Sequence, residues 1–131
     1  MNREYATQII TKLLEYGVAE FYVCAGARNI PIVEVLLQIE HAKKIVFNHF
    51  EERSAAFYAL GRIKQIAKPV AVITTSGTAV GELLPAVMEA YHAGLPLVML
   101  TADRPKSQRH CGAPQTTNQK NIFNALVFLG H

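Results

Sequence analysis

Four short apolar runs, separated by segments long enough for helices, constrain the fold of this chain more than any other feature. They lie at 18–24, 44–48, 69–75 and 95–101. Apolar residues occupy consecutive positions in them, which is typical of strands buried on both faces. Strands that alternate with helices form parallel sheets, because each crossover returns the chain to the same sheet edge. The pattern predicts a doubly wound α/β domain, a parallel sheet with helices on both faces.

The segments before and between these runs carry helical periodicity and helical end signals. In the first of them, Tyr5, Ile9 and Leu13 recur at helical spacing, and Gly17 follows as a C-terminal cap. Pro85 lies inside the fourth segment and is expected to kink that helix, because proline lacks an amide hydrogen. The predicted helices are 4–16, 31–41, 51–67, the stretch from the 76–78 turn to about 93, and 118–128, with a long polar loop at 102–117.

Composition narrows the class of protein. The chain has 131 residues, 50% of them hydrophobic, and a net charge of +3. This size suits one domain over 1–131 that buries roughly two thirds of its unfolded surface. No apolar run approaches the ~20 residues of a spanning helix, and the start lacks the apolar core of a signal peptide, so we expect a cytoplasmic chain with no membrane partner. Acids interrupt the basic residues, so no nucleic-acid partner is expected.

Familiar short motifs for metals, nucleotides and hydrolysis are missing from the sequence. Cys24 and Cys111 lie far apart and are expected to be reduced in the cytosol. The five histidines lack zinc-site spacings, so no metal held by this chain alone is expected. The glycine-rich phosphate-binding and dinucleotide-binding patterns and the hydrolase elbow G-x-S-x-G are also absent.

The polar residues gather in the loops that follow the predicted strands, where doubly wound domains bind their ligands. Glu51 and Glu52 allow two interpretations: they stabilise the helix dipole, or one of them faces the ligand crevice and shares a proton with a heterocycle nitrogen. The basic cluster of Arg104, Lys106 and Arg109 is either a solvated loop or an anion site. The loops in question are 25–30, 48–52, 75–78 and 102–117.

Several ordered motifs on these loops and the adjoining helices resemble one enzyme family. Residues 48–61 are similar to the segment around the catalytic glutamate of thiamine-diphosphate enzymes. Further motifs narrow the resemblance to the succinyl-enolpyruvyl-hydroxycyclohexene-carboxylate (SEPHCHC) synthases of menaquinone biosynthesis. These motifs lie at 26–31, 74–79, 84–91, 96–105 and 111–115. Because they keep their order over about 4–125, the resemblance is more specific than any single motif.

The resemblance implies a thiamine-diphosphate-dependent transferase, a carboligase that decarboxylates a 2-oxo acid and joins the remainder to a second substrate. It assigns Glu52 the catalytic role, in which the carboxyl group hydrogen-bonds N1′ of the aminopyrimidine and helps the cofactor lose a proton. Gly77 and Thr78 would line the pyrimidine pocket. In this family the substrates are 2-oxoglutarate and isochorismate, and both are anions.

The resemblance also assigns substrate contacts. Arg28, Arg104 and Gln115 would contact substrate carboxylates, which the guanidinium fork matches with two hydrogen bonds. Arg28 could instead cap its own loop. Two departures from the family pattern fall beside these residues, since Ala27 replaces a serine and Pro114 replaces an asparagine. The resemblance therefore supports the cofactor class more firmly than the substrate.

The resemblance covers only the family's pyrimidine-binding (PYR) domain. The middle domain and the diphosphate-binding domain, which holds Mg²⁺ and the cofactor's diphosphate, have no counterpart in these residues. We therefore expect the chain to be inactive alone, to need a diphosphate-binding domain on another chain or in a missing C-terminal part, and to self-associate as a homodimer. Two alternatives stay open: a subunit of a split thiamine-diphosphate 2-oxo acid decarboxylase, and a non-catalytic PYR-like module.

Overall fold

The computed structural model describes residues 1–40 and 44–127, which contain one four-stranded sheet. Every neighbouring pair of strands is parallel, and the strand order is β2-β1-β3-β4. The strands are β1 (Glu20–Val23), β2 (Val46–Asn48), β3 (Val70–Thr74) and β4 (Leu97–Thr101). They are shorter than the apolar runs that predicted them, because flanking residues such as Val18 pack in the core without joining a strand. The predicted parallel sheet is confirmed.

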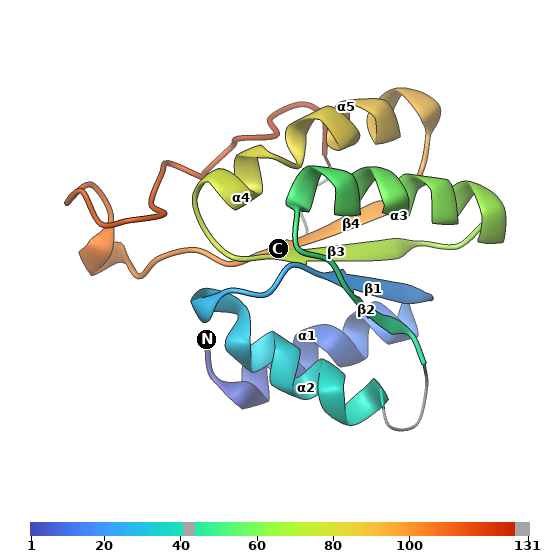
Figure 1. The fold of residues 1–131 in the computed structure, drawn as a ribbon, viewed down its shortest axis with the longest axis horizontal. Helices are drawn as coiled ribbons and strands as arrows, with labels where there is room; N and C mark the ends of the chain where they lie inside the picture. The colour runs from blue at the N-terminus through green and yellow to red at the C-terminus, as the bar shows by residue number, and fades with distance from the viewer. Residues whose placement is uncertain (41–43, 128–131) are drawn as a thin grey trace.

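Helices cover both faces of this sheet, as predicted for a doubly wound domain (Figure 1). One face carries α1 (Arg3–Glu15) and α2 (Ile30–Glu40). The opposite face carries α3 (Glu52–Ile66), α4 (Thr78–Gly81) and α5 (Leu84–Ala93). Two short 3₁₀ helices, η1 (Ala27–Asn29) and η2 (Lys106–Gln108), lie in the loops. No helix in the described part of the chain is both long and apolar enough to cross a lipid bilayer.

The core consists of two apolar layers, one on each side of the sheet. In β1, Phe21 and Val23 pack against α1 and α2, whereas Tyr22 belongs to the layer beneath α3 and α5. Every residue of β3 is buried. Successive side chains of a strand point to opposite faces, so a strand between two helical layers needs apolar residues at consecutive positions. This explains the runs that dominate the sequence.

The structure corrects the prediction of one kinked helix between the 76–78 turn and residue 93. The helix breaks instead: α4 ends at Gly81, a turn at Glu82 and Leu83 follows, and α5 begins at Leu84. Pro85 therefore lies in the first turn of α5, where its missing amide hydrogen removes no helical hydrogen bond.

The predicted helix at 118–128 is wrong over the residues that the structure describes, and residue 128 lies outside them. Residues 120–125 form separate turns, each closed by a hydrogen bond such as that from the Asn124 amide to the Asn121 carbonyl (3.0 Å). Asn121 and Ala125 have φ angles of 62° and 60°. These left-handed conformations interrupt a right-handed helix. Phe123 still reaches the core beneath α3 and α5.

Candidate functional site

The carboxyl ends of all four strands meet at one edge of the sheet. The chain leaves β1 toward β2 on one side and β3 toward β4 on the other, so the topological switch point lies between β1 and β3. The loops after these two strands touch each other closely. A Cβ added at Gly26 would lie 2.6 Å from the Thr75 Cβ. Only glycine fits there without moving the neighbouring loop.

A buried asparagine that the sequence analysis did not single out holds the loop after β1. The Asn29 side chain is 1% exposed. Its amide nitrogen donates to the Cys24 carbonyl (2.9 Å), and its amide oxygen accepts from the Gly26 backbone nitrogen (2.9 Å). These two bonds close the loop and set the start of η1, which carries Arg28. An asparagine two residues before a predicted helix was the available signal, because such residues favour loop hydrogen bonds.

The two adjacent acids at the start of α3 have different environments. Glu51 is the N-cap, and its carboxylate accepts from the backbone nitrogens of Arg53 (3.0 Å) and Ser54 (2.7 Å). The hydrogen bonds from Ser54 lower the pKa of Glu51. Glu52 is partly buried, and within the described residues its carboxylate accepts no hydrogen bond and forms no ion pair. Glu51 therefore serves the helix, while Glu52 keeps its carboxylate available.

The charge of Glu52 acts on the end of β1. The Cys24 thiol is buried, and burial, followed by the negative charges of Glu52 and Glu51, raises the pKa of Cys24 to about 12. The thiol therefore stays protonated and is a poor nucleophile at neutral pH.

The turn after β3 lies against the long loop that follows β4. Gly77 has φ 77° and ψ −131°, and its backbone nitrogen donates to the Gln119 side-chain oxygen (2.9 Å). The Gln119 amide nitrogen donates to the Ala102 carbonyl (2.9 Å), and the Ser76 hydroxyl donates to the Gln115 carbonyl (2.8 Å). Gly77 is thus buried below the backbone of Gln115.

The remaining predicted residues of this region are exposed. Thr78 begins α4, and its side chain faces solvent. Gln115 is also exposed, and its amide group makes no hydrogen bond within the described residues. Both side chains are therefore free to contact a molecule that approaches the strand ends.

The two arginines predicted to bind substrate come together. A terminal nitrogen of the Arg28 guanidinium and one of the Arg104 guanidinium both donate to the side-chain oxygen of Gln108, at 3.1 Å and 3.0 Å. A second Arg104 nitrogen donates to the Pro114 carbonyl (2.6 Å). Within the described residues, neither guanidinium has an acidic partner. Arg109 of the predicted basic cluster differs, because it pairs with Asp103 (2.9 Å).

Two hollows in the surface lie beside these residues rather than among them. One, of about 430 Å³, is enclosed by 103–120 and lined among others by His110, Gln119 and Lys120. Neither of these two hollows is lined by Glu52, Gly77, Thr78, Arg28, Arg104 or Gln115, although Arg109 of the basic cluster lines the first one.

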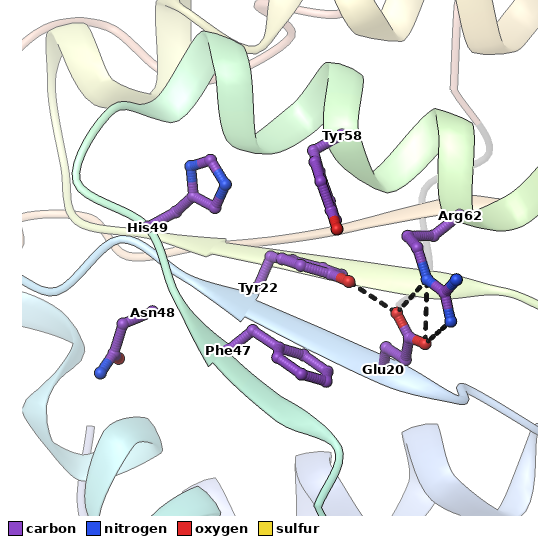
Figure 2. A pocket seen from close by; sticks show the side chains of 7 residues that line it. All are labelled: Glu20, Tyr22, Phe47, Asn48, His49, Tyr58 and Arg62. Carbon is purple, nitrogen blue, oxygen red and sulfur yellow. Dashed lines mark hydrogen bonds and ion pairs between the residues drawn. The ribbon is translucent and has the colours of Figure 1, made fainter.

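The second hollow, of about 390 Å³, runs along the side of α3 (Figure 2). Tyr22 stacks on Phe47 with ring centroids 5.2 Å apart, and Tyr58 leans toward Tyr22 from α3. At its far end the Arg62 guanidinium holds the Glu20 carboxylate, which also accepts from the Tyr22 hydroxyl (2.7 Å). Arg62 lowers the pKa of Glu20. The charges here neutralise each other, so this hollow offers aromatic faces rather than charge.

Comparison with known proteins decides the family. The profile of the thiamine pyrophosphate enzyme, N-terminal TPP binding domain, matches residues 3–122. The chain belongs to this family. The resemblance to thiamine-diphosphate enzymes that the sequence indicates is thereby confirmed. The predicted fold class is also confirmed, since the parallel sheet agrees with this domain. Thiamine pyrophosphate is thiamine diphosphate under another name.

Three curated relatives carry the same name, 2-succinyl-5-enolpyruvyl-6-hydroxy-3-cyclohexene-1-carboxylate synthase. The chain is 55% identical to the protein of Bdellovibrio bacteriovorus over 123 residues, 55% identical to that of Akkermansia muciniphila over 107 and 49% identical to that of Renibacterium salmoninarum over 126. These alignments cover 94%, 82% and 96% of this chain but 23%, 20% and 23% of the relatives. The chain therefore spans about a fifth of the length of the relatives that it matches.

Proposed function

We propose that this chain is the pyrimidine-binding part of a thiamine-diphosphate-dependent carboligase that acts on a 2-oxo acid, as the shared name of its relatives suggests. The observation that carries the proposal is the difference between Glu51 and Glu52. The Glu51 carboxylate is used in capping α3, whereas the Glu52 carboxylate is partly buried and has no hydrogen-bond or ion-pair partner among the described residues. A partly buried carboxylate that bonds to no protein group can share a proton with a bound ligand.

The strand-end residues fit the aminopyrimidine end of the cofactor. The free carboxylate of Glu52 can share a proton with the ring nitrogen N1′. The hydroxyl of Thr75 is buried at the same edge without a hydrogen-bond partner among the described residues. Gly77 and Thr78 lie on the turn next to it. When bound, thiamine diphosphate supplies a stabilised carbanion equivalent for decarboxylation and carbon–carbon bond formation.

The residues of this chain have two roles, which are to bind the substrates and to hold a proton at the cofactor's N1′. Glu52 holds the proton at N1′ while the carboxylate of Glu51 keeps the first turn of α3 in place. Arg28 and Arg104 present uncompensated positive charge to the carboxylates of 2-oxoglutarate and isochorismate, with the exposed Gln115 beside them. Ala27 and Pro114 offer no side-chain hydrogen bonds, so the two guanidiniums supply the main polar contacts.

The diphosphate and its Mg²⁺ would bind elsewhere. The described residues contain no group of three histidine, cysteine, aspartate or glutamate side chains that could hold a metal ion. The exposed side chains of Thr78 and Gln115 leave room for a diphosphate-binding domain to complete the site, either on another chain or in the remaining length that the relatives have. We propose that the chain is a single PYR domain over 1–131, inactive alone and active in a self-associated assembly.

The adjacent glutamates provide a matched test in the complete natural polypeptide with thiamine diphosphate and Mg²⁺. Glu52→Gln keeps the shape of the side chain but cannot accept a proton, so turnover should fall at least about a hundredfold. Glu51→Gln should leave most of the turnover and slightly reduce the free energy of unfolding, because it weakens a helix cap. Unchanged turnover in Glu52→Gln would contradict the catalytic role and favour a non-catalytic module.

Product analysis separates the remaining alternative. The wild-type assembly is supplied with 2-oxoglutarate, with and without isochorismate, and with pyruvate as a simple 2-oxo acid. The proposal predicts a joined product that requires both anions. An aldehyde or oxidised acid formed equally well from pyruvate alone would favour a split 2-oxo acid decarboxylase.

A further inference from the structure

One neutral side chain gathers two positively charged groups at the strand ends. The side-chain oxygen of Gln108 accepts from the guanidiniums of both Arg28 and Arg104. Arg28 belongs to η1 after β1, Arg104 follows β4, and Gln108 is the last residue of η2. Because both guanidinium nitrogens donate to the same oxygen, the distance between them cannot exceed the sum of the two hydrogen-bond lengths. Gln108 therefore sets the spacing between the two guanidiniums.

No acidic side chain among the described residues forms an ion pair with the Arg28 or Arg104 guanidinium. Residues 24–30 contain no acid, and residues 102–120 contain only Asp103. The Asp103 carboxylate bonds to the Arg109 side chain (2.9 Å) and to the backbone nitrogen of Arg104 (2.7 Å), not to either guanidinium. Two like charges held together without a counter-ion repel each other. A bound anion would relieve this repulsion.

Hydrogen-bond donors also remain unused. Each guanidinium carries five N–H groups. Within the described residues Arg28 donates only to Gln108, and Arg104 donates only to Gln108 and Pro114. The Arg104 Nε is buried and has no acceptor among these residues. A carboxylate, with two oxygens that accept several hydrogen bonds, matches what the two side chains leave open.

We propose that Gln108 is a positioning residue, which holds Arg28 and Arg104 as a two-armed clamp for one carboxylate group of an anionic substrate. The inference rests on the proposed function and adds a residue to it. The proposal depends on the absence of charge on the Gln108 side chain. A carboxylate at this position would hold the arginines at least as firmly, but it would neutralise the charge that the substrate needs.

Substitutions of Gln108 separate this role from a merely structural one. Gln108→Glu keeps the shape and both contacts, whereas Gln108→Leu removes both. If Gln108 only supported the loop, the glutamate variant would be tolerated and the leucine variant would be worse. The clamp predicts the reverse order: Gln108→Glu should weaken binding of the carboxylate substrate at least about tenfold, and Gln108→Leu roughly threefold. Ser107→Ala, on the exposed neighbour in η2, is the matched control and should bind normally.

The measurement is equilibrium binding of 2-oxoglutarate and of isochorismate, each alone, to the complete natural polypeptide by titration calorimetry, with circular dichroism as a check on folding. The anion whose binding is weakened identifies the substrate that supplies the carboxylate. Normal binding of both anions by Gln108→Glu, or no binding of either by the wild type, overturns the clamp. The proposed cofactor role is tested separately, by the turnover of Glu52→Gln, so its failure and the failure of the clamp are distinguishable.

Discussion

Replacing Gly77 with alanine should undock the long loop after β4 from the turn after β3. Gly77 has φ 77° and ψ −131°, a backbone conformation that residues with a Cβ rarely adopt and that costs about 1–3 kcal/mol when imposed on them. An added Cβ would also lie 2.6 Å from the carbonyl carbon and 2.7 Å from the carbonyl oxygen of Gln115. These are backbone atoms, so no side-chain rotation relieves the contact.

The cost can be worked from the bonds that the contact breaks. If Gln115 moves away, the loop loses the Ser76 hydroxyl bond to its carbonyl and the Gly77 amide bond to Gln119. At about 1 kcal/mol for each bond, and with the backbone strain added, the docked loop loses about 3 kcal/mol. This corresponds to roughly a hundredfold faster opening exchange of the loop.

Hydrogen–deuterium exchange followed by mass spectrometry measures this effect locally in the complete natural polypeptide. Peptides covering 112–120 should exchange roughly a hundredfold faster in Gly77→Ala, while peptides from β1 stay unchanged. Gly61→Ala is the control, because a Cβ at Gly61 in α3 meets no atom within 4 Å and alanine favours a helix. Equal protection of 112–120 in Gly77→Ala and wild type would refute the reasoning from the close contact.

Two further predictions concern buried groups. The raised pKa of Cys24, about 12 against an ordinary value of 9.0, means that the unfolded chain releases the thiol proton first. Stability should therefore be fully present below pH 9 and decline as the pH rises toward 12, and Cys24→Ala should remove this part of the decline in urea titrations across that range. Arg62→Met leaves the buried Glu20 carboxylate without its charged partner, so the free energy of unfolding should fall. The double variant with Glu20→Gln should recover part of that loss, and equal destabilisation of single and double variants would show that charge is not the cause.

The site could be predicted from the sequence only in part, and the two glutamates show where prediction stopped. A strand followed by a helix that opens with Glu51 and Glu52 indicates two acids near a strand end, but it leaves open whether they stabilise the helix dipole or one of them faces the ligand crevice. The resemblance to thiamine-diphosphate enzymes favoured Glu52, and the capping geometry of Glu51 supplies an independent physical reason. Capping depends on the backbone angles of one residue, which periodicity does not report.

The two wrong helix predictions also arose because local sequence patterns do not report backbone geometry. The sequence predicts a helix at 118–128, but the chain there turns repeatedly, and the Gln119 side chain hydrogen-bonds Gly77 and Ala102. The break before α5 also depended on geometry, because proline is compatible with either a kink or a new first turn. Tertiary contacts override weak local preferences of this kind.

The sequence by itself determined the class of fold. Consecutive apolar residues in the strands and helical spacing between them are direct consequences of burial on two faces, and they specify a parallel sheet whose strand ends meet at one edge. Only the tertiary structure decided which of the polar residues at that edge contact one another. Arg28, Gln108 and Arg104 meet because β1, β3 and β4 lie side by side, and Gly77 meets Gln115 because a long loop folds back on its neighbour. Such contacts join residues distant in the chain, and no local pattern encodes them.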